Sequence, residues 1–283
     1  MGIFSDVLLV SDYDDTLTQP GGLPNADGKI TKMTQIPQAN LDAIAAFERE
    51  GGLFTIASGR TRIYYDSVIR ARITPSAPLV LANGAHIFDA KAGKDVLVRP
   101  LPDNVKLLAH DVTKRFPRAA LEAQRTGDMC VVYCPRGDEE YYQNLPYHVE
   151  GDIDSYPGPW IKLHFSGPHD EIAALMRYTQ ENYPGFECVE SVPTVCEMQS
   201  RGVTKGDAAR RLAKELGRSI LVCVGDAPND LPMLEESDYA FVTESGFASV
   251  REMGFLSAAP SRKGAVADVI RQMRGILEQK GRA

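Results

Sequence analysis

Short apolar runs separated by polar loops and amphipathic segments characterise the first part of the chain. Mainly apolar residues at 6–10, 53–57 and 79–82 are typical of buried strands. Between the first two runs, apolar positions recur at helical spacing over residues 40–48, and Gly51-Gly52 ends this predicted helix. Residues 17–36 show no period and are predicted to form a loop. Alternating strands and helices predict a parallel sheet with crossover helices.

The same pattern returns near the C-terminus. A helix is predicted at 204–216, with Gly217 at its end, and an apolar strand follows at 220–224. A short helix at 229–236, a strand at 239–242 and a closing helix at 264–277 complete the pattern. The two ends together predict one α/β core of Rossmann-like, three-layer α/β/α type.

The middle of the chain has a different character. The stretch between Arg60 and Lys205 is far longer than the roughly dozen residues that a crossover needs. It contains two helical stripes, which begin near Val105 and Ile172, and strand-like runs at 119–125, 129–134, 160–165 and 186–189. We therefore expect an inserted α+β domain at 86–193, and a core domain formed by 1–85 and 194–283.

Composition and charge exclude several classes of protein. The 283 residues are 43% hydrophobic and 24% charged, as in globular proteins, and 31 basic against 38 acidic residues give a net charge of −7. Without a basic block, nucleic-acid binding is not expected. No apolar run approaches the ~18 residues of a membrane span, and no signal peptide is evident, so we expect a cytoplasmic protein without membrane contact. Cys130 and Cys134 have no partner pair at zinc-site spacing, which predicts reduced thiols.

Two acidic segments follow predicted strands. In an open α/β sheet, ligands bind beyond the carboxyl ends of the strands. In Asp12-x-Asp14-x-Thr16, two carboxylates on an extended segment point the same way and repel unless a divalent cation lies between them. Gly225-Asp226-Ala227-Pro228-Asn229-Asp230 offers further oxygen ligands for a hard cation. Taken singly, each segment could also be a polar turn with helix-capping Asp.

Two segments are suited to bind an anion. Ser58-Gly59-Arg60 follows a buried strand and offers a hydroxyl and free backbone N–H groups at a helix start, although an ordinary capped turn has the same appearance. Lys205 lies in the first turn of a predicted helix, where a cation is unfavourable unless an anion is close. A solvated surface lysine is the alternative at this position.

Together these four segments resemble the haloacid dehalogenase superfamily of phosphatases, and they occur in its order along the chain. Asn83-Gly84-Ala85 and the late insertion are similar to the Cof-type branch, subfamily IIB, which includes the sucrose-phosphatase-like enzymes and carries a C2B-type cap between its second and third motifs. One departure is Asp15, where many Cof-type members have Gly. The resemblance covers both core segments, and the cap only by position.

The resemblance implies a role for each residue. Asp12 would be the nucleophile and a Mg²⁺ ligand, and Asp14 the general acid and then base, with its backbone carbonyl on the metal. Asp226 would complete the protein ligands of the metal, supported by Asp230 at its edge. The phosphoryl oxygens would be bound by Ser58, Gly59, Lys205 and Asn229.

The substrate's leaving group should face the predicted cap. Residues 160–165 alternate, so Trp160, Lys162 and His164 are expected on one face, which suits either a sugar or phosphate leaving group or plain solvent. Similar caps place a lysine of such a strand near the substrate, so Lys162 is the first candidate of the cap, and His164 on the same face is the second. Arg60 and Asn83 are candidates on the core side.

These observations predict a Mg²⁺-dependent phosphatase that acts on a small phosphorylated metabolite, with a sugar phosphate favoured, through an aspartyl-phosphate on Asp12. A phosphomutase similar to phosphomannomutase would use the same residues, and a non-catalytic sensor of phosphorylated ligands is a third possibility. A dinucleotide-binding enzyme is disfavoured, because Asp-x-Asp replaces the glycine-rich turn after the first strand. We expect a monomer or homodimer.

Overall fold

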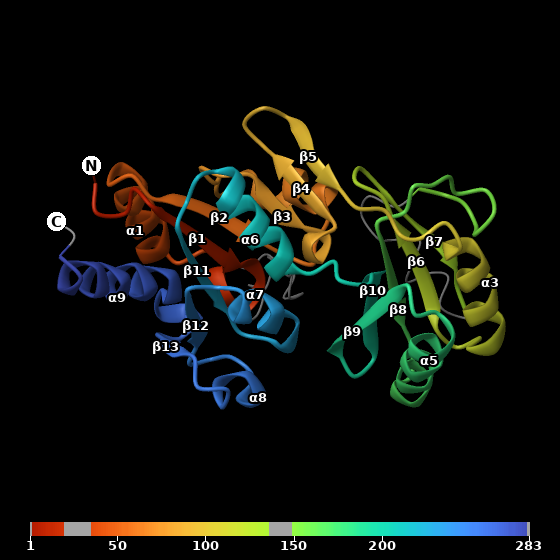
Figure 1. The fold of residues 1–283 in the computed structure, drawn as a ribbon. Helices are drawn as coiled ribbons and strands as arrows, with labels where there is room; N and C mark the ends of the chain where they lie inside the picture. Colours follow the sequence, from red (N-terminus) through yellow and green to blue (C-terminus); the bar gives the residue numbers. More distant parts are fainter. Residues whose placement is uncertain (1, 20–34, 136–148, 282–283) are drawn as a thin grey trace, which may run out of the picture.

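The structure, a computed structural model, describes residues 2–19, 35–135 and 149–281, which form two sheets side by side (Figure 1). Most of the loop predicted at 17–36 lies outside these residues. The larger sheet contains eight strands: β1 (Val7–Asp12), β2 (Leu53–Ala57), β3 (Leu79–Leu81), β4 (His86–Asp89), β5 (Lys94–Val98), β11 (Ile220–Gly225), β12 (Tyr239–Thr243) and β13 (Leu256–Ala258).

The larger sheet is mainly parallel. Its order is β13-β12-β11-β1-β2-β3-β4-β5, and only the β3–β4 and β4–β5 pairs are antiparallel. All residues of the central β1 are buried, as expected for a strand covered on both faces. The register pairs Asp12 with Ala57 and Ser11 with Val224, so the carboxyl ends of β2, β1 and β11 meet at one edge.

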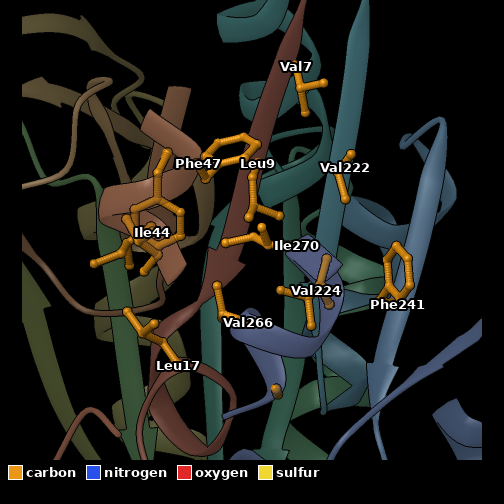
Figure 2. Close-up of a cluster of buried hydrophobic side chains, with 14 of the residues drawn as sticks. Val7, Leu9, Leu17, Ile44, Phe47, Val222, Val224, Phe241, Val266 and Ile270 are labelled. Carbon is orange, nitrogen blue, oxygen red and sulfur yellow. The ribbon is translucent and has the colours of Figure 1, made fainter. Parts of the chain in front are cut away.

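Helices cover both faces of this sheet. Val7 and Leu9 of β1 pack against α1 (Gln38–Arg49) and α9 (Ala265–Gln279), and Figure 2 shows this cluster. Leu8 and Val10 point the other way and pack with α6 (Lys205–Glu215) and α7 (Leu231–Glu235), because neighbouring side chains of a strand alternate between its faces. The predicted three-layer α/β core is therefore confirmed. Two short helices, α2 (Arg62–Tyr64) and α8 (Ala248–Arg251), lie in connections.

The smaller sheet is antiparallel, and together with the helices on one of its faces it forms a two-layered unit. Its order is β7-β6-β8-β10-β9, and its strands are β6 (Ala120–Gln124), β7 (Met129–Tyr133), β8 (Lys162–Ser166), β9 (Phe186–Val192) and β10 (Val195–Ser200). Helices α3 (Val105–Arg115) and α5 (His169–Asn182) pack on one face through a second hydrophobic cluster. All five cysteines are free thiols. No helix among the described residues has the length and apolar character needed to cross a bilayer.

Strand pairing differs from the predicted boundaries of the insert at both of its ends. Strands β4 and β5, which were expected within 86–193, pair with β3 in the larger sheet. Strand β10, which was expected in the core segment 194–283, pairs with β8 and β9 in the smaller sheet. Local alternation identifies a strand but not its neighbour, because the partner is decided by tertiary hydrogen bonding.

Candidate active site

The loop after β1 presents the first acidic pair. Asp12 is the last residue of β1, and Thr16 Oγ1 donates a hydrogen bond to Asp226 Oδ1 at 2.7 Å, which ties this loop to the end of β11. Asp15 has a φ of +58°, in the left-handed region that glycine adopts freely and that Asp tolerates better than most residues. Backbone conformation therefore explains why Asp can stand where many Cof-type proteins have Gly.

Lys205 lies at the bottom of the site. It begins α6, whose first turn is capped by the Thr204 hydroxyl accepting from the Asp207 amide at 3.0 Å. Its Nζ donates to Asp12 Oδ1 at 2.6 Å and to Asp230 Oδ1 at 2.7 Å, and its side chain is 1% exposed. Lys205 is thus buried between two carboxylates, and the alternative of a solvated surface lysine is wrong.

Asp230 closes the loop after β11. Its Oδ2 accepts from the amides of Asp226 at 3.0 Å and Ala227 at 3.1 Å. A Cβ atom on Gly225 would lie 2.6 Å from the Asp230 side chain, so the loop needs glycine at that position. Asp230 therefore holds both the loop and the Lys205 ammonium group.

The acidic group has a charge that suits a divalent cation. One carboxylate oxygen from each of Asp12, Asp226 and Asp230 lies within 4.8 Å of the others, and all three residues are buried. Three carboxylates against the Lys205 ammonium leave two negative charges in excess. Burial, followed by the charge of Asp230, raises the pKa of Asp226 to about 7, and burial raises the pKa of Asp12 although Lys205 opposes it. Oxygen ligands with this charge fit Mg²⁺.

The side chain of Asp14 lies outside this acidic group. Arg60 holds it with two hydrogen bonds, from Nε to Oδ2 at 2.7 Å and from Nη2 to Oδ1 at 2.9 Å. The guanidinium lies 3.7 Å from the centre of the Tyr64 ring, which fixes its plane. Ser58 Oγ accepts from the Arg60 amide at 3.2 Å. Arg60 therefore orients the carboxylate for which the sequence predicted proton transfer.

A cleft of about 760 Å³ opens between the two sheets. The predicted site residues that line it are Asp12, Asp14, Ser58, Gly59, Arg60, Lys162, His164, Asp226 and Asn229. Three further predicted residues lie behind this lining. Lys205 contacts Asp12 of the lining, Asp230 contacts Lys205, and Asn83 contacts Glu197 of the lining. The structure thus brings the predicted residues of both segments of the core, and two of the smaller sheet, to one cavity.

A polar network joins the two sheets at one side of the cleft. Lys162 Nζ donates to the carbonyl of Gly59 at 2.6 Å and to the carboxylate of Glu197. Asn83 Nδ2 donates to Glu197 Oε2 at 2.7 Å. Burial alone would raise the pKa of Glu197, but the Lys162 ammonium lowers it to about 2. Glu197 was not among the predicted site residues. Its two neighbours, Cys196 and Met198, are buried, and this alternation along β10 is the signal that places the Glu197 side chain on the opposite face, toward the cleft.

Trp160 does not share the cleft-facing side of Lys162 and His164, so that prediction is wrong. The regular strand β8 begins only at Lys162, and Trp160 belongs to the hydrophobic cluster beneath α3 and α5. Its ring stacks on Tyr156 with centroids 6.0 Å apart, and the residue is 2% exposed. Two-residue alternation holds only within extended backbone and therefore does not reach Trp160.

A sequence model of the haloacid dehalogenase-like hydrolase family matches residues 9–270, and the chain belongs to this family. A Haemophilus influenzae protein that carries a provisional phosphatase name is 21% identical over 244 residues, 80% of each chain. A Streptococcus pyogenes protein with the same kind of name is 38% identical over 65 residues, 22% of this chain and 24% of that protein.

Solved structures of the same superfamily share the fold. A haloacid dehalogenase-like hydrolase from Bacteroides thetaiotaomicron has a TM-score of 0.72 at 16% identity, covering 94% of this chain and 98% of that one. A structure described as a subclass IIB sugar phosphatase has a TM-score of 0.74 at 15% identity, with the same coverage. The predicted superfamily and hydrolase class are confirmed by the family match, and the α/β fold by these structures.

Proposed function

We propose that this hydrolase is a Mg²⁺-dependent phosphatase that acts on a small phosphorylated metabolite, with a sugar phosphate favoured, through an aspartyl-phosphate on Asp12. The phosphatase class is what the family and the curated relatives support. The observation that carries the proposal is the position of Asp12, which lines the cleft while its Oδ1 is held by buried Lys205 beside two further carboxylates.

Asp12 is the proposed nucleophile. Its carboxylate forms a bond to phosphorus while the bond from phosphorus to the leaving oxygen breaks. Lys205 stabilises the negative charge that Asp12 shares with the transferring group. Asp12, Asp226 and the backbone of Asp14 would hold Mg²⁺, with Asp230 at the edge, and the bound ion would supply further positive charge at the phosphoryl oxygens. Residues for the remaining phosphoryl oxygens are Ser58, Gly59 and Asn229, on the wall of the cleft.

Asp14 is the proposed general acid and base. It donates a proton to the leaving oxygen, and then takes one from the water that attacks the aspartyl-phosphate. The ion pair with Arg60 holds the Asp14 carboxylate at the cleft. In each proton transfer, one oxygen of Asp14 gives up its hydrogen bond to Arg60 and bonds instead to an oxygen of the substrate or of water. We place Arg60 in this positioning role.

The insert is the proposed cap. Its polar face forms one wall of the cleft, and Lys162 connects it to Gly59 of the core. Closure of this cap would exclude water and enclose a small substrate.

A cytoplasmic location, consistent with five free cysteines, and a monomeric or homodimeric state belong to the same proposal.

Phosphate release from a panel of phosphorylated metabolites tests this proposal. The wild type should release phosphate only with Mg²⁺, and Asp12→Asn should lower kcat by roughly 10⁴-fold or more. Asp42→Asn on the exposed side of α1 is the matched control and should leave kcat unchanged. Release that survives in Asp12→Asn, or no release from any ester, would refute the proposal. Activity that requires a sugar bisphosphate would indicate a phosphomutase, and binding of a phosphorylated metabolite without turnover would indicate a sensor.

A further inference from the structure

The smaller sheet turns a continuous polar face toward the cleft, and we call this face the roof. It consists of Glu122 and Gln124 of β6, Lys162 and His164 of β8, and Glu197 of β10. Strand pairing sets His164 beside Glu122 and Glu197, and Lys162 beside Gln124. The leaving group of a substrate whose phosphoryl group contacts Asp12 must lie against this roof, because the roof and the Asp12 loop line the same cleft.

The roof carries an excess of negative charge. Glu122 and Glu197 are two carboxylates against one ammonium on Lys162, so the formal net charge is minus one with His164 counted as neutral. Lys162 is already bound to Glu197 and to the carbonyl of Gly59. Arg60, on the opposite wall, is bound to Asp14. Among the described lining residues, each lysine and arginine is therefore already paired with a carboxylate.

An unpaired acceptor lies in the same roof. Gln124 is 6% exposed, and its Nε2 donates to Glu122, while its Oε1 has no hydrogen-bond partner in the described part of the chain. Buried acceptors are normally satisfied, so a ligand with hydroxyl or ammonium donors would complete this wall.

We propose that the roof selects phosphate monoesters whose leaving group is rich in hydrogen-bond donors and carries no second negative charge, with an ammonium-bearing sugar preferred over a neutral one. This inference rests on the phosphatase function proposed above. Charges separated by about 5–10 Å near a protein surface interact strongly enough to change affinity by roughly tenfold or more per unit charge. A sugar bisphosphate, which a phosphomutase must bind, is accordingly a poor ligand.

Substrates of similar size and different charge test the inference. With Mg²⁺ at pH 7, kcat/KM should fall in the order glucosamine 6-phosphate, glucose 6-phosphate, 6-phosphogluconate, by roughly tenfold at each step. Fructose 1,6-bisphosphate should likewise be poorer than fructose 6-phosphate. Equal or higher kcat/KM for the anionic members, while an aryl phosphate is hydrolysed in an Asp12-dependent manner, overturns the inference and leaves the phosphatase intact. Absence of Asp12-dependent release from the aryl phosphate overturns the phosphatase itself.

Removing single charges from the roof gives the second arm. Glu122→Gln should reduce the ratio of kcat/KM for glucosamine 6-phosphate to that for 6-phosphogluconate by roughly tenfold. Glu197→Gln should reduce it further, since it also releases the Lys162 ammonium. Glu181→Gln, on the exposed side of α5 and outside the cleft, is the matched control and should keep the wild-type ratio. Ratios that stay at the wild-type value in both roof variants would overturn the inference.

Discussion

Replacing Lys205 with methionine removes the ammonium group that lies between Asp12 and Asp230. Lys205 is 1% exposed, and its partners are 9% and 0% exposed, so water cannot replace it. Although burial opposes it, attraction to these two carboxylates raises the pKa of Lys205 and keeps it charged. Breaking a buried ion pair from one side costs about 3–5 kcal/mol, and we expect this loss in the free energy of unfolding without Mg²⁺.

The loss should depend on pH, with a definite sign. Burial raises the pKa of Asp12 and of Asp226, and Lys205 opposes both shifts, so without Lys205 these two carboxylates hold protons still more tightly in the folded than in the unfolded protein. The folded state then binds more protons, so the stability of the variant falls as pH rises above the unfolded carboxyl pKa of about 3.9. The destabilisation relative to wild type should therefore be larger at pH 8 than at pH 6.

Urea unfolding followed by circular dichroism at the two pH values measures this effect. Lys214→Met, on the exposed side of the same helix, is the matched control and should change stability by less than about 0.5 kcal/mol. Adding Asp230→Asn to Lys205→Met removes one surplus carboxylate and should recover about 1–3 kcal/mol. A Lys205→Met protein as stable as the wild type at pH 8 would refute the electrostatic account of the site.

Three further predictions concern the acidic loops. Since burial raises the pKa of Asp226 to about 7, protons compete with Mg²⁺, and the gain in Tm on adding Mg²⁺ should be larger at pH 8 than at pH 6; equal gains in differential scanning fluorimetry would contradict this. Asp15→Gly should retain stability, whereas Asp15→Val should cost about 1–2 kcal/mol in urea unfolding, because φ is +58°. Gly225→Ala should displace Asp230 and weaken Mg²⁺ binding by about tenfold or more in calorimetry, and unchanged affinity would show that Asp230 does not support the metal.

Several contacts of the cleft could not be predicted from the sequence. Arg60 was a candidate for substrate contact, but nothing in Ser58-Gly59-Arg60 indicates that its guanidinium pairs with Asp14, a residue on another strand end. Glu197 was missed because its partners, Lys162 and Asn83, come from distant segments of the chain. The first two contacts depend on which strands become neighbours within a sheet, and the contact of Asn83 with Glu197 depends on how the two sheets approach one another. Local periodicity encodes neither.

The sequence by itself determined the α/β core and the four polar segments at its strand ends. Buried strands, helix ends and turn glycines are specified by residues close together in the chain, and parallel strands necessarily bring their carboxyl ends to one edge. Tertiary structure alone decided which sheet received β4, β5 and β10, and that Trp160 entered a hydrophobic cluster instead of the cleft. It also decided the charge of the roof, since this is the sum of side chains from three strands that only the antiparallel pairing brings together.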